Sequence, residues 1–333
     1  MERSQFTRQL IILGIVLLVV FSLALFIGRY PQPYWMSPRL LLSDSLAQRL
    51  VLNLRLPRLL TALILGMSLA AAGTVMQMIF RNPLVEPGFL GVTQGAAFGA
   101  ALSILLVSRH PLSMELSATF FGLLGLLAST WLANRLRFGG WVLRLVLSGI
   151  AVSALFSAGV GILKYLADPL TELPEITFWL LGGLYSVTWR DFLYVLPFAL
   201  IGILTAWFMR WRVNLLSLND ETAYSLGASL TRERAVLLAA VITGAAALTA
   251  ISGIISWVGL IIPHIARRTA GASAEKSIPA AMLIGGIFTI LSDTIARTLL
   301  PGEIPLGILT AGIGSILFMY LMMSAGLKVR SDV

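Results

Sequence analysis

Long apolar runs without a single charged residue recur along the whole chain. A helix needs about 20 apolar residues to cross the hydrocarbon core of a bilayer, which is about 30 Å thick. Seven runs approach or exceed that length: 10–28, 59–80, 87–108, 116–134, 145–163, 192–209 and 304–327. None alternates apolar and polar residues as the strands of a membrane β-barrel do. The pattern therefore predicts an all-α polytopic membrane protein.

Another region, 235–266, is apolar over too many residues to form one simple span. It contains Gly253 and Pro263, which belong to the residue types that interrupt helices or let them bend. We therefore expect two helices here, 235–252 and 254–268.

Two further segments complete the predicted fold. Residues 277–299 form one more largely apolar run. Residues 176–189 are too few to span a bilayer and contain Gly182 and Gly183, so we expect a short helix at one membrane surface. The prediction is about ten transmembrane helices in a single domain, 1–333.

Composition agrees with this fold. The chain is 58% apolar and 12% charged, whereas a soluble domain has about 25% charged residues. It has no cysteine, which excludes disulfides, thiol catalysis and cysteine metal sites. The first run follows Arg3 and Arg8, as the core of a signal peptide would, but such a core has about 7–15 residues. We expect residues 10–28 to remain as a helix.

The net charge of +9 is spread unevenly over the predicted loops. If the N-terminus is cytoplasmic, the cytoplasmic segments hold fifteen of the 24 Lys and Arg residues and the other side holds nine. Basic residues accumulate in the cytoplasmic loops of membrane proteins. This asymmetry and the even helix number predict that both termini are cytoplasmic. The basic surplus then needs no nucleic-acid partner to explain it.

A weak internal repeat relates two parts of the chain. Gly73 and Pro83 recur as Gly253 and Pro263, each pair offset by 180 positions, near the ends of two helices rich in small residues. These are the second and seventh predicted helices, which cross in opposite directions. An inverted repeat of helices 2–5 and 7–10 would give this relation, as in many transporters, and chance similarity is the alternative.

Small residues also form stripes at helical spacing. Gly91, Gly95 and Gly99 favour close helix packing, as in other membrane helices. A second stripe has either the same packing role or lines a solute pathway: Gly149, Ser153, Ser157 and Gly161.

The residues of the familiar catalytic and metal-binding motifs are missing. The sequence has no phosphate loop, no His-Glu-x-x-His and no Gly-x-Ser-x-Gly. His110 and His264 lie far apart, and we interpret each as a capped loop residue. Charges inside the predicted spans are few, and Asp293 and Arg297 are spaced to pair with each other. The chain is therefore not expected to be an enzyme or to hold a metal, and its energy should come from a partner.

Five stretches carry a resemblance to a known family: Arg-Leu-Pro-Arg at 55–58, Asn-Pro-Leu-Val-Glu-Pro at 82–87, Trp-Leu-Leu-Gly-Gly at 179–183, Gly-Leu-Ile-Ile-Pro-His at 259–264 and Ser-Asp-Thr-Ile-Ala-Arg at 292–297. In order and spacing, from about 40 to 325, the chain resembles the permeases of binding-protein-dependent ABC importers for iron siderophores, haem and vitamin B12. The resemblance implies two permease copies, identical or paralogous, around one pathway. It also implies two ATPase subunits, which hold the ATP and magnesium, and a periplasmic or lipoprotein binding protein.

The resemblance assigns expected roles to particular residues. Arg55, Arg58 and Arg297 would dock acidic residues of the binding protein, unless they only anchor helix ends. An inner gate would form from Asn82 and Leu84 with Val142 and Leu143. Relatives can have hydroxyl residues at the second pair, so this gate would be more apolar and would close by excluding water.

The cytoplasmic segment 212–232 resembles the part of the family that couples to the ATPase, with a short helix within 217–227. Asn219 or Asp220 could cap that helix and Gly227 could end it. The residues expected to couple are Asp220, Glu221, Ala223, Leu226 and Gly227. A solvated interfacial helix is the alternative.

These observations predict the permease subunit of an ABC importer of the inner membrane that carries an iron chelate, either a siderophore or haem. Cobalamin and molybdate are alternative solutes for the same class of importer. An ion-coupled secondary transporter is less consistent with the scarcity of buried charge, and an intramembrane enzyme lacks a catalytic pair.

Overall fold

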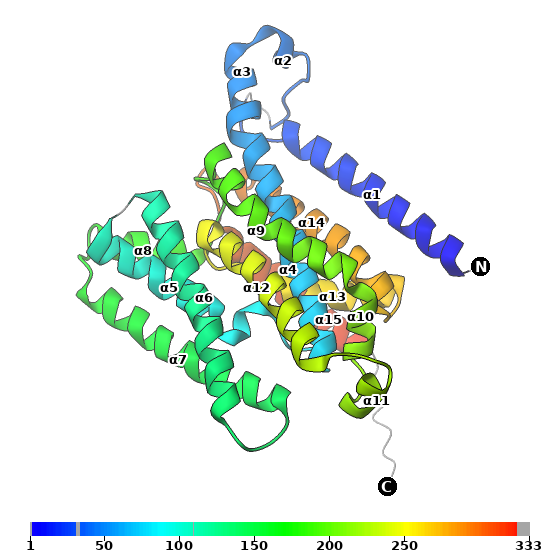
Figure 1. The fold of residues 1–333 in the computed structure, drawn as a ribbon. Helices are drawn as coiled ribbons and strands as arrows, with labels where there is room; N and C mark the ends of the chain where they lie inside the picture. The colour runs from blue at the N-terminus through cyan, green and yellow to red at the C-terminus, as the bar shows by residue number, and fades with distance from the viewer. Residues whose placement is uncertain (1, 31–33, 109, 325–333) are drawn as a thin grey trace.

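The computed structural model describes all residues except 1, 31–33, 109 and 325–333, and the described part consists of helices joined by loops, with one isolated bridge between Ile27 and Trp35 (Figure 1). The elements are α1 (Glu2–Phe26), α2 (Leu40–Ser43), α3 (Ser45–Arg49), η1 (Leu50–Arg55), α4 (Leu56–Ile79), η2 (Pro87–Leu90), α5 (Val92–Leu102), η3 (Ser103–Val107), α6 (Pro111–Arg135), α7 (Trp141–Leu166), α8 (Glu172–Leu181), α9 (Trp189–Phe208), α10 (Arg210–Leu216), α11 (Asp220–Ser225), α12 (Leu230–Ser252), α13 (Val258–Ala270), α14 (Ala274–Thr298) and α15 (Leu306–Ser324). The predicted all-α fold is confirmed.

All ten predicted spans contain a helix, but they differ in length. Eight of the helices in the described part are long and apolar enough to cross a membrane. The other two are shorter: the continuous apolar helix Val92–Val107 and the 13-residue α13. The predicted interruption near Gly253 is confirmed, because α12 ends at Ser252 and Gly253 has a φ of 64°. The expected end of the last span at 327 lies outside the described residues.

A helical extension above the bundle was not predicted. It consists of α2, α3 and the π-helical η1, and it runs from Ser45 without a break into α4 (Figure 1). The sequence obscured this helix because Arg49, Arg55 and Arg58 interrupt its apolar pattern.

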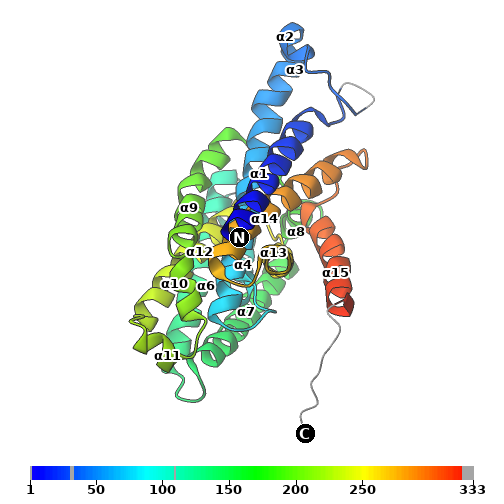
Figure 2. The ribbon, with the colours of Figure 1, turned by 90° about the vertical axis from the view of Figure 1, so that its right-hand side faces the viewer.

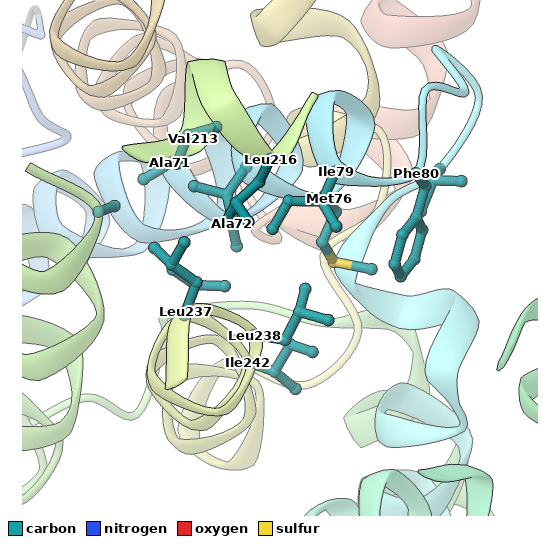
Figure 3. Close-up of a cluster of buried hydrophobic side chains, with 14 of the residues drawn as sticks. Ala71, Ala72, Met76, Ile79, Phe80, Val213, Leu216, Leu237, Leu238 and Ile242 are labelled. Carbon is teal, nitrogen blue, oxygen red and sulfur yellow. The ribbon is translucent and has the colours of Figure 1, made fainter. Parts of the chain in front are cut away.

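Helix α4 lies at the centre of the bundle and is buried on nearly every side. Its lower half packs with α10 and α12 around Met76, Ile79 and Leu237 (Figure 3). A Cβ added at Gly73 would come within 1.9 Å of the carbonyl oxygen of Gly259. Glycine therefore allows α13 to approach α4 backbone to backbone, as small residues do in membrane helices.

The glycine stripe of the third predicted helix has the packing role expected for it. A Cβ at Gly95 would lie 2.3 Å from the carbonyl oxygen of Phe121, and one at Gly99 would lie 2.4 Å from that of Ser117. Both neighbours belong to α6, so the stripe joins α5 to α6 along their length.

Helices of the two halves pack against each other, and the inverted repeat stays a prediction. Helix α4 packs against α13 and α14, whereas α12 packs against α5 and α6. The two leading helices also contact each other. Helices α1 and α15 both contact α14 and lie at the edge of the bundle (Figure 2).

Candidate functional site

The short helix α11 lies at the end of the bundle opposite α2 and α3 (Figure 1). Arg234 of α12 donates to the Asp220 carboxylate at 2.7 Å, which fixes the start of α11. This hydrogen bond lowers the pKa of Asp220 from its ordinary value. Arg212 pairs with Glu233 and so ties α10 to α12. A six-residue helix is not stable by itself in water, and the pair of Arg234 with Asp220 holds α11 against α12.

The predicted coupling residues divide into an outer and an inner set. Glu221 and Leu226 are exposed, and Gly227 adopts a φ of 81° just after the helix, as expected for its end. Ala223 is fully buried and packs against the core. Tyr224, which the sequence analysis did not select, is 76% exposed beside Leu226.

The N-cap position of α11 is Asn219, but its side chain makes no capping hydrogen bond. Its Oδ1 instead accepts from Arg81 at 2.6 Å. Arg81 follows the end of α4 and has a φ of 50°. The link therefore runs from the coupling segment to the loop expected to form the gate.

Hydrogen bonds hold the loop that follows α4 at two positions. The Asn82 Oδ1 accepts from the backbone N–H of Leu84 at 3.0 Å, and His264 Nε2 lies 3.0 Å from the carbonyl oxygen of Pro83. The interpretation of His264 as a loop residue is wrong, because it lies within α13; His110 does cap α6, accepting from the N–H of Leu112.

The two gate loops adjoin within the chain. Phe80 at the end of α4 meets Trp141 at the start of α7 edge to face, with ring centroids 5.9 Å apart. Leu84 lies on the loop after α4 and is 50% exposed, whereas Val142 and Leu143 lie in the first turn of α7, where Leu143 is 49% exposed. Sequence analysis found the loops by resemblance and missed the aromatic contact that joins them.

A cavity of about 480 Å³ opens above the gate loop, between η2, α5, α7 and α12. The Glu86 carboxylate in its wall accepts from the backbone N–H of Trp257 at 3.3 Å. The other polar residues of the wall are neutral, and no Lys, Arg or His lines it within the described part of the chain: Thr93, Gln94, Ser153, Thr249 and Ser256.

Some residues of the small-residue stripe on α7, which was predicted to line a solute pathway, line this cavity and others do not. Ser153 lines it, whereas a Cβ at Gly149 would lie 2.3 Å from the carbonyl oxygen of Phe89, so Gly149 serves packing. Ser157 and Gly161 lie further along α7 and are exposed.

The three arginines expected to dock a binding protein surround a second cavity, of about 380 Å³, at the opposite end of the bundle. Their guanidinium groups have internal partners. Arg55 donates to the carbonyl oxygens of Leu25 and Tyr30 at 3.1 and 3.0 Å, and Arg297 donates to that of Ala24. Each of the two is less than a tenth exposed.

Arg58 joins a buried network that the sequence did not reveal. Its Nε donates to Asp293 at 2.9 Å, and it pairs with Glu303 at the same distance. Asp293 is completely buried, and Arg297 Nε lies 3.6 Å from its other oxygen. The expected pair of Asp293 and Arg297 is confirmed, but Arg58 of α4 is the closer partner.

The described residues contain no group of His, Asp and Glu placed to hold a metal ion. The arrangement is that of a polytopic membrane protein with a cavity in its helix bundle and the short helix α11 at one end. The model of the FecCD transport family matches residues 16–324, and the chain belongs to that family.

Curated relatives span nearly the same length. The molybdate import system permease MolB of Haemophilus influenzae is 39% identical over 96% of both chains. The hemin transport system permease HmuU of Yersinia pestis is 39% identical over 82% of both. A solved inward-facing structure described as a metal-chelate type ABC transporter is 37% identical, with a TM-score of 0.88 over 96% of this chain and 99% of that one.

Proposed function

We propose that this chain is the permease subunit of an inner-membrane ABC importer and that its solute is an iron chelate, a siderophore or haem. The family membership carries the proposal, supported by relatives whose names specify iron chelatin and hemin transport. The cavity beside η2 fits a bulky solute, because its wall is mostly apolar with scattered neutral polar groups. A second copy of the chain or a paralogue would complete the pathway.

Molybdate is the second candidate solute. The full-length similarity to MolB favours it. Against it, the cavity has one carboxylate, Glu86, and no basic side chain to balance an oxyanion. A small dianion surrounded by apolar groups would lack charge compensation, which favours the chelate.

The proposed energy source is a pair of separate ATPase subunits that grip α11. The exposed Tyr224 and Leu226 would fill a groove of the ATPase, and the buried Ala223 would pass its movement to α4 and α12. Arg81 and Asn219 would carry the same movement to the gate loop. Both termini would then be cytoplasmic.

At the opposite end, Arg55, Arg58 and Arg297 would attract the acidic face of a binding protein through the cavity that they border. Charge reversal at Arg55 and Arg58 should slow docking, and more strongly at low salt, because screening weakens with falling ionic strength.

Reconstitution tests the function directly. The permease and its cognate ATPase in liposomes should hydrolyse ATP faster when binding protein loaded with a ferric chelate is added. Mass spectrometry of the solute on that binding protein separates a chelate from molybdate. Uptake that proceeds unchanged without any ATPase would instead indicate an ion-coupled transporter.

A further inference from the structure

A cavity of about 590 Å³ lies between α6, α7 and α12, near the end that carries α11. It is separate from the cavity beside η2 and has two chemically different halves. One half is polar and contains Thr130, Asn134, Arg144, Asp220 and Arg234. The other half is apolar and is lined by Leu126, Leu127, Leu145, Leu238 and Ala239.

Aromatic residues place the polar half at the membrane surface. Trp131 on α6 is 61% exposed, and the guanidinium of Arg135 lies 5.4 Å from its ring. Trp207 on α9 has Arg210 over its ring at 4.7 Å. Exposed Trp residues with basic neighbours mark the level of the lipid headgroups. Thr130 flanks Trp131, so the polar half of the cavity lies at that level.

The apolar half lies deeper in the membrane. Leu126 and Leu127 precede Trp131 by about one turn of α6, and a turn advances about 5.4 Å along the axis. Leu238 and Ala239 lie about one turn past Arg234 on α12, in the same direction away from α11. The cavity therefore passes from headgroup level to acyl-chain level along both helices.

The two arginines retain unused hydrogen-bond donors. Arg234 is only 5% exposed and Arg144 is partly buried, yet the Nε of each is buried without a hydrogen-bond partner among the described residues. Arg144 uses its Nη1 on the carbonyl oxygen of Leu136, and Arg234 uses its Nη atoms on Asp220. The cavity wall thus has two guanidinium groups and one carboxylate, Asp220, which pairs with Arg234 alone, so its charged residues carry an excess positive charge. A positive charge beside an apolar wall is unfavourable without a counter-charge, and an anionic ligand in the cavity would supply one.

We propose that this cavity binds an anionic phospholipid, with its phosphate on Arg144 and Arg234 and an acyl chain along Leu127 and Leu238. Basic pockets between membrane helices on the cytoplasmic side bind such headgroups. A free phosphate would use the arginines but leave the apolar half without a function. The lipid phosphate also competes with Asp220 for Arg234, so the lipid composition of the membrane acts on the orientation of α11.

Native mass spectrometry of the full chain tests the site. The delipidated protein is mixed with phosphatidylglycerol or with zwitterionic phosphatidylcholine, and retained lipid is counted. Phosphatidylglycerol should be retained in preference, and Arg144→Gln should weaken its binding roughly fivefold. Arg135→Gln is the matched control, because it removes a cation from the same membrane level outside the cavity, and it should change retention little.

A second variant keeps both charges. Ala239→Trp fills the apolar half from an exposed position on α12, and it should displace phosphatidylglycerol while leaving Arg144 and Arg234 intact. If Arg144→Gln does not fold, lipid retention by Ala239→Trp tests the proposal instead. Equal retention of the two lipids, retention unchanged by both Arg144→Gln and Ala239→Trp, or release of the lipid by millimolar inorganic phosphate would overturn the proposal. Since lipid retention is measured without transport, a wrong solute assignment would not affect the result.

Discussion

The guanidinium of Arg81 donates a hydrogen bond of 2.6 Å to the side-chain oxygen of Asn219, across 138 positions of sequence. Arg81 occupies the position after the C-cap of α4 in a left-handed conformation, where glycine is usual. The N–H of Asn82 bonds to the carbonyl oxygen of Gln77, and that of Arg81 bonds to Met78, which is a Schellman motif. An arginine here costs backbone strain that glycine would avoid, and its side chain provides the link to the coupling segment.

Arg81→Gly distinguishes the effect of the left-handed backbone at position 81 from the effect of the side-chain hydrogen bond to Asn219. The backbone already suits glycine, so the melting temperature should stay equal or rise, since a non-glycine residue in this conformation costs about 1 kcal/mol. The hydrogen bond to Asn219 is lost, and the uptake per ATP hydrolysed should fall, by roughly fivefold for about 1 kcal/mol of coupling. Asn219→Ala should give the same loss, and the double variant should be no worse than either single one. Losses that simply multiply would show that the two residues act independently.

Glu221→Arg tests whether α11 transmits the movement of the ATPase to the membrane helices. Glu221 is exposed on the first turn of α11, so the variant should fold normally. Its reversed charge should disturb the contact with the ATPase and lower ATP-driven uptake several-fold. Glu275→Arg reverses a charge at the exposed start of α14 and serves as the control. Normal uptake by Glu221→Arg would contradict the proposed coupling of α11 to the ATPase.

Arg58→Ala tests the buried network at the other end. Asp293 is fully buried and would keep only Arg297, whose Nε is 3.6 Å away. Breaking a buried ion pair costs about 3–5 kcal/mol, so the melting temperature should drop clearly. Arg49→Ala, on the exposed surface of α3, should change it little. Adding Asp293→Asn should restore part of the stability, because it removes the buried negative charge that Arg58 no longer balances.

The same Arg58→Ala variant distinguishes anchoring from docking. If Arg58 only anchors α4 and α14, the folded fraction should bind loaded binding protein at the wild-type rate. If it also docks the partner, the association rate should fall even after correction for the folded fraction.

Stability should depend on acid through Asp220. Its pKa is lowered by Arg234, so the ionised carboxylate is favoured in the folded state. The stability from this pair is fully present above the ordinary pKa, about 3.9, and is lost as the pH falls through the lowered value. The wild type should therefore melt slightly above Asp220→Asn from about pH 8 to about pH 5, and the difference should shrink at lower pH and vanish below the lowered pKa of Asp220. A difference that grows on acidification would contradict the assignment.

Gly73→Ala tests the close approach of α4 and α13. The added methyl would lie 1.9 Å from the carbonyl oxygen of Gly259, so the two helices would have to separate. Overpacking of this kind costs about 1–3 kcal/mol, and the melting temperature should fall. Gly14→Ala in α1, where nothing lies within 4 Å of the new Cβ, should be neutral or slightly stabilising. Equal melting of the two variants would show that α13 adapts without cost.

Much of the fold could be predicted from the sequence, because lipid requires every spanning segment to be apolar and helical. The runs at 116–134 and 145–163 lie within α6 and α7, and Gly253 correctly divided α12 from α13. The extension through α3 and η1 was missed because its arginines look like loop residues. They are tolerated in a helix since the bundle supplies Arg55 with carbonyl acceptors and Arg58 with carboxylates.

The sequence by itself determined the fold class, the approximate positions of the spans and the motifs that mark the family. Only the tertiary structure decided which charges meet: Arg58 with Asp293, Arg81 with Asn219, and Arg144 with Arg234 around one cavity. The physical reason is that each segment must by itself be long and apolar enough to cross the bilayer, and these two properties are visible in its own sequence. The partner of a buried side chain depends instead on how the helices are rotated and how closely glycines let them approach, which no single segment encodes.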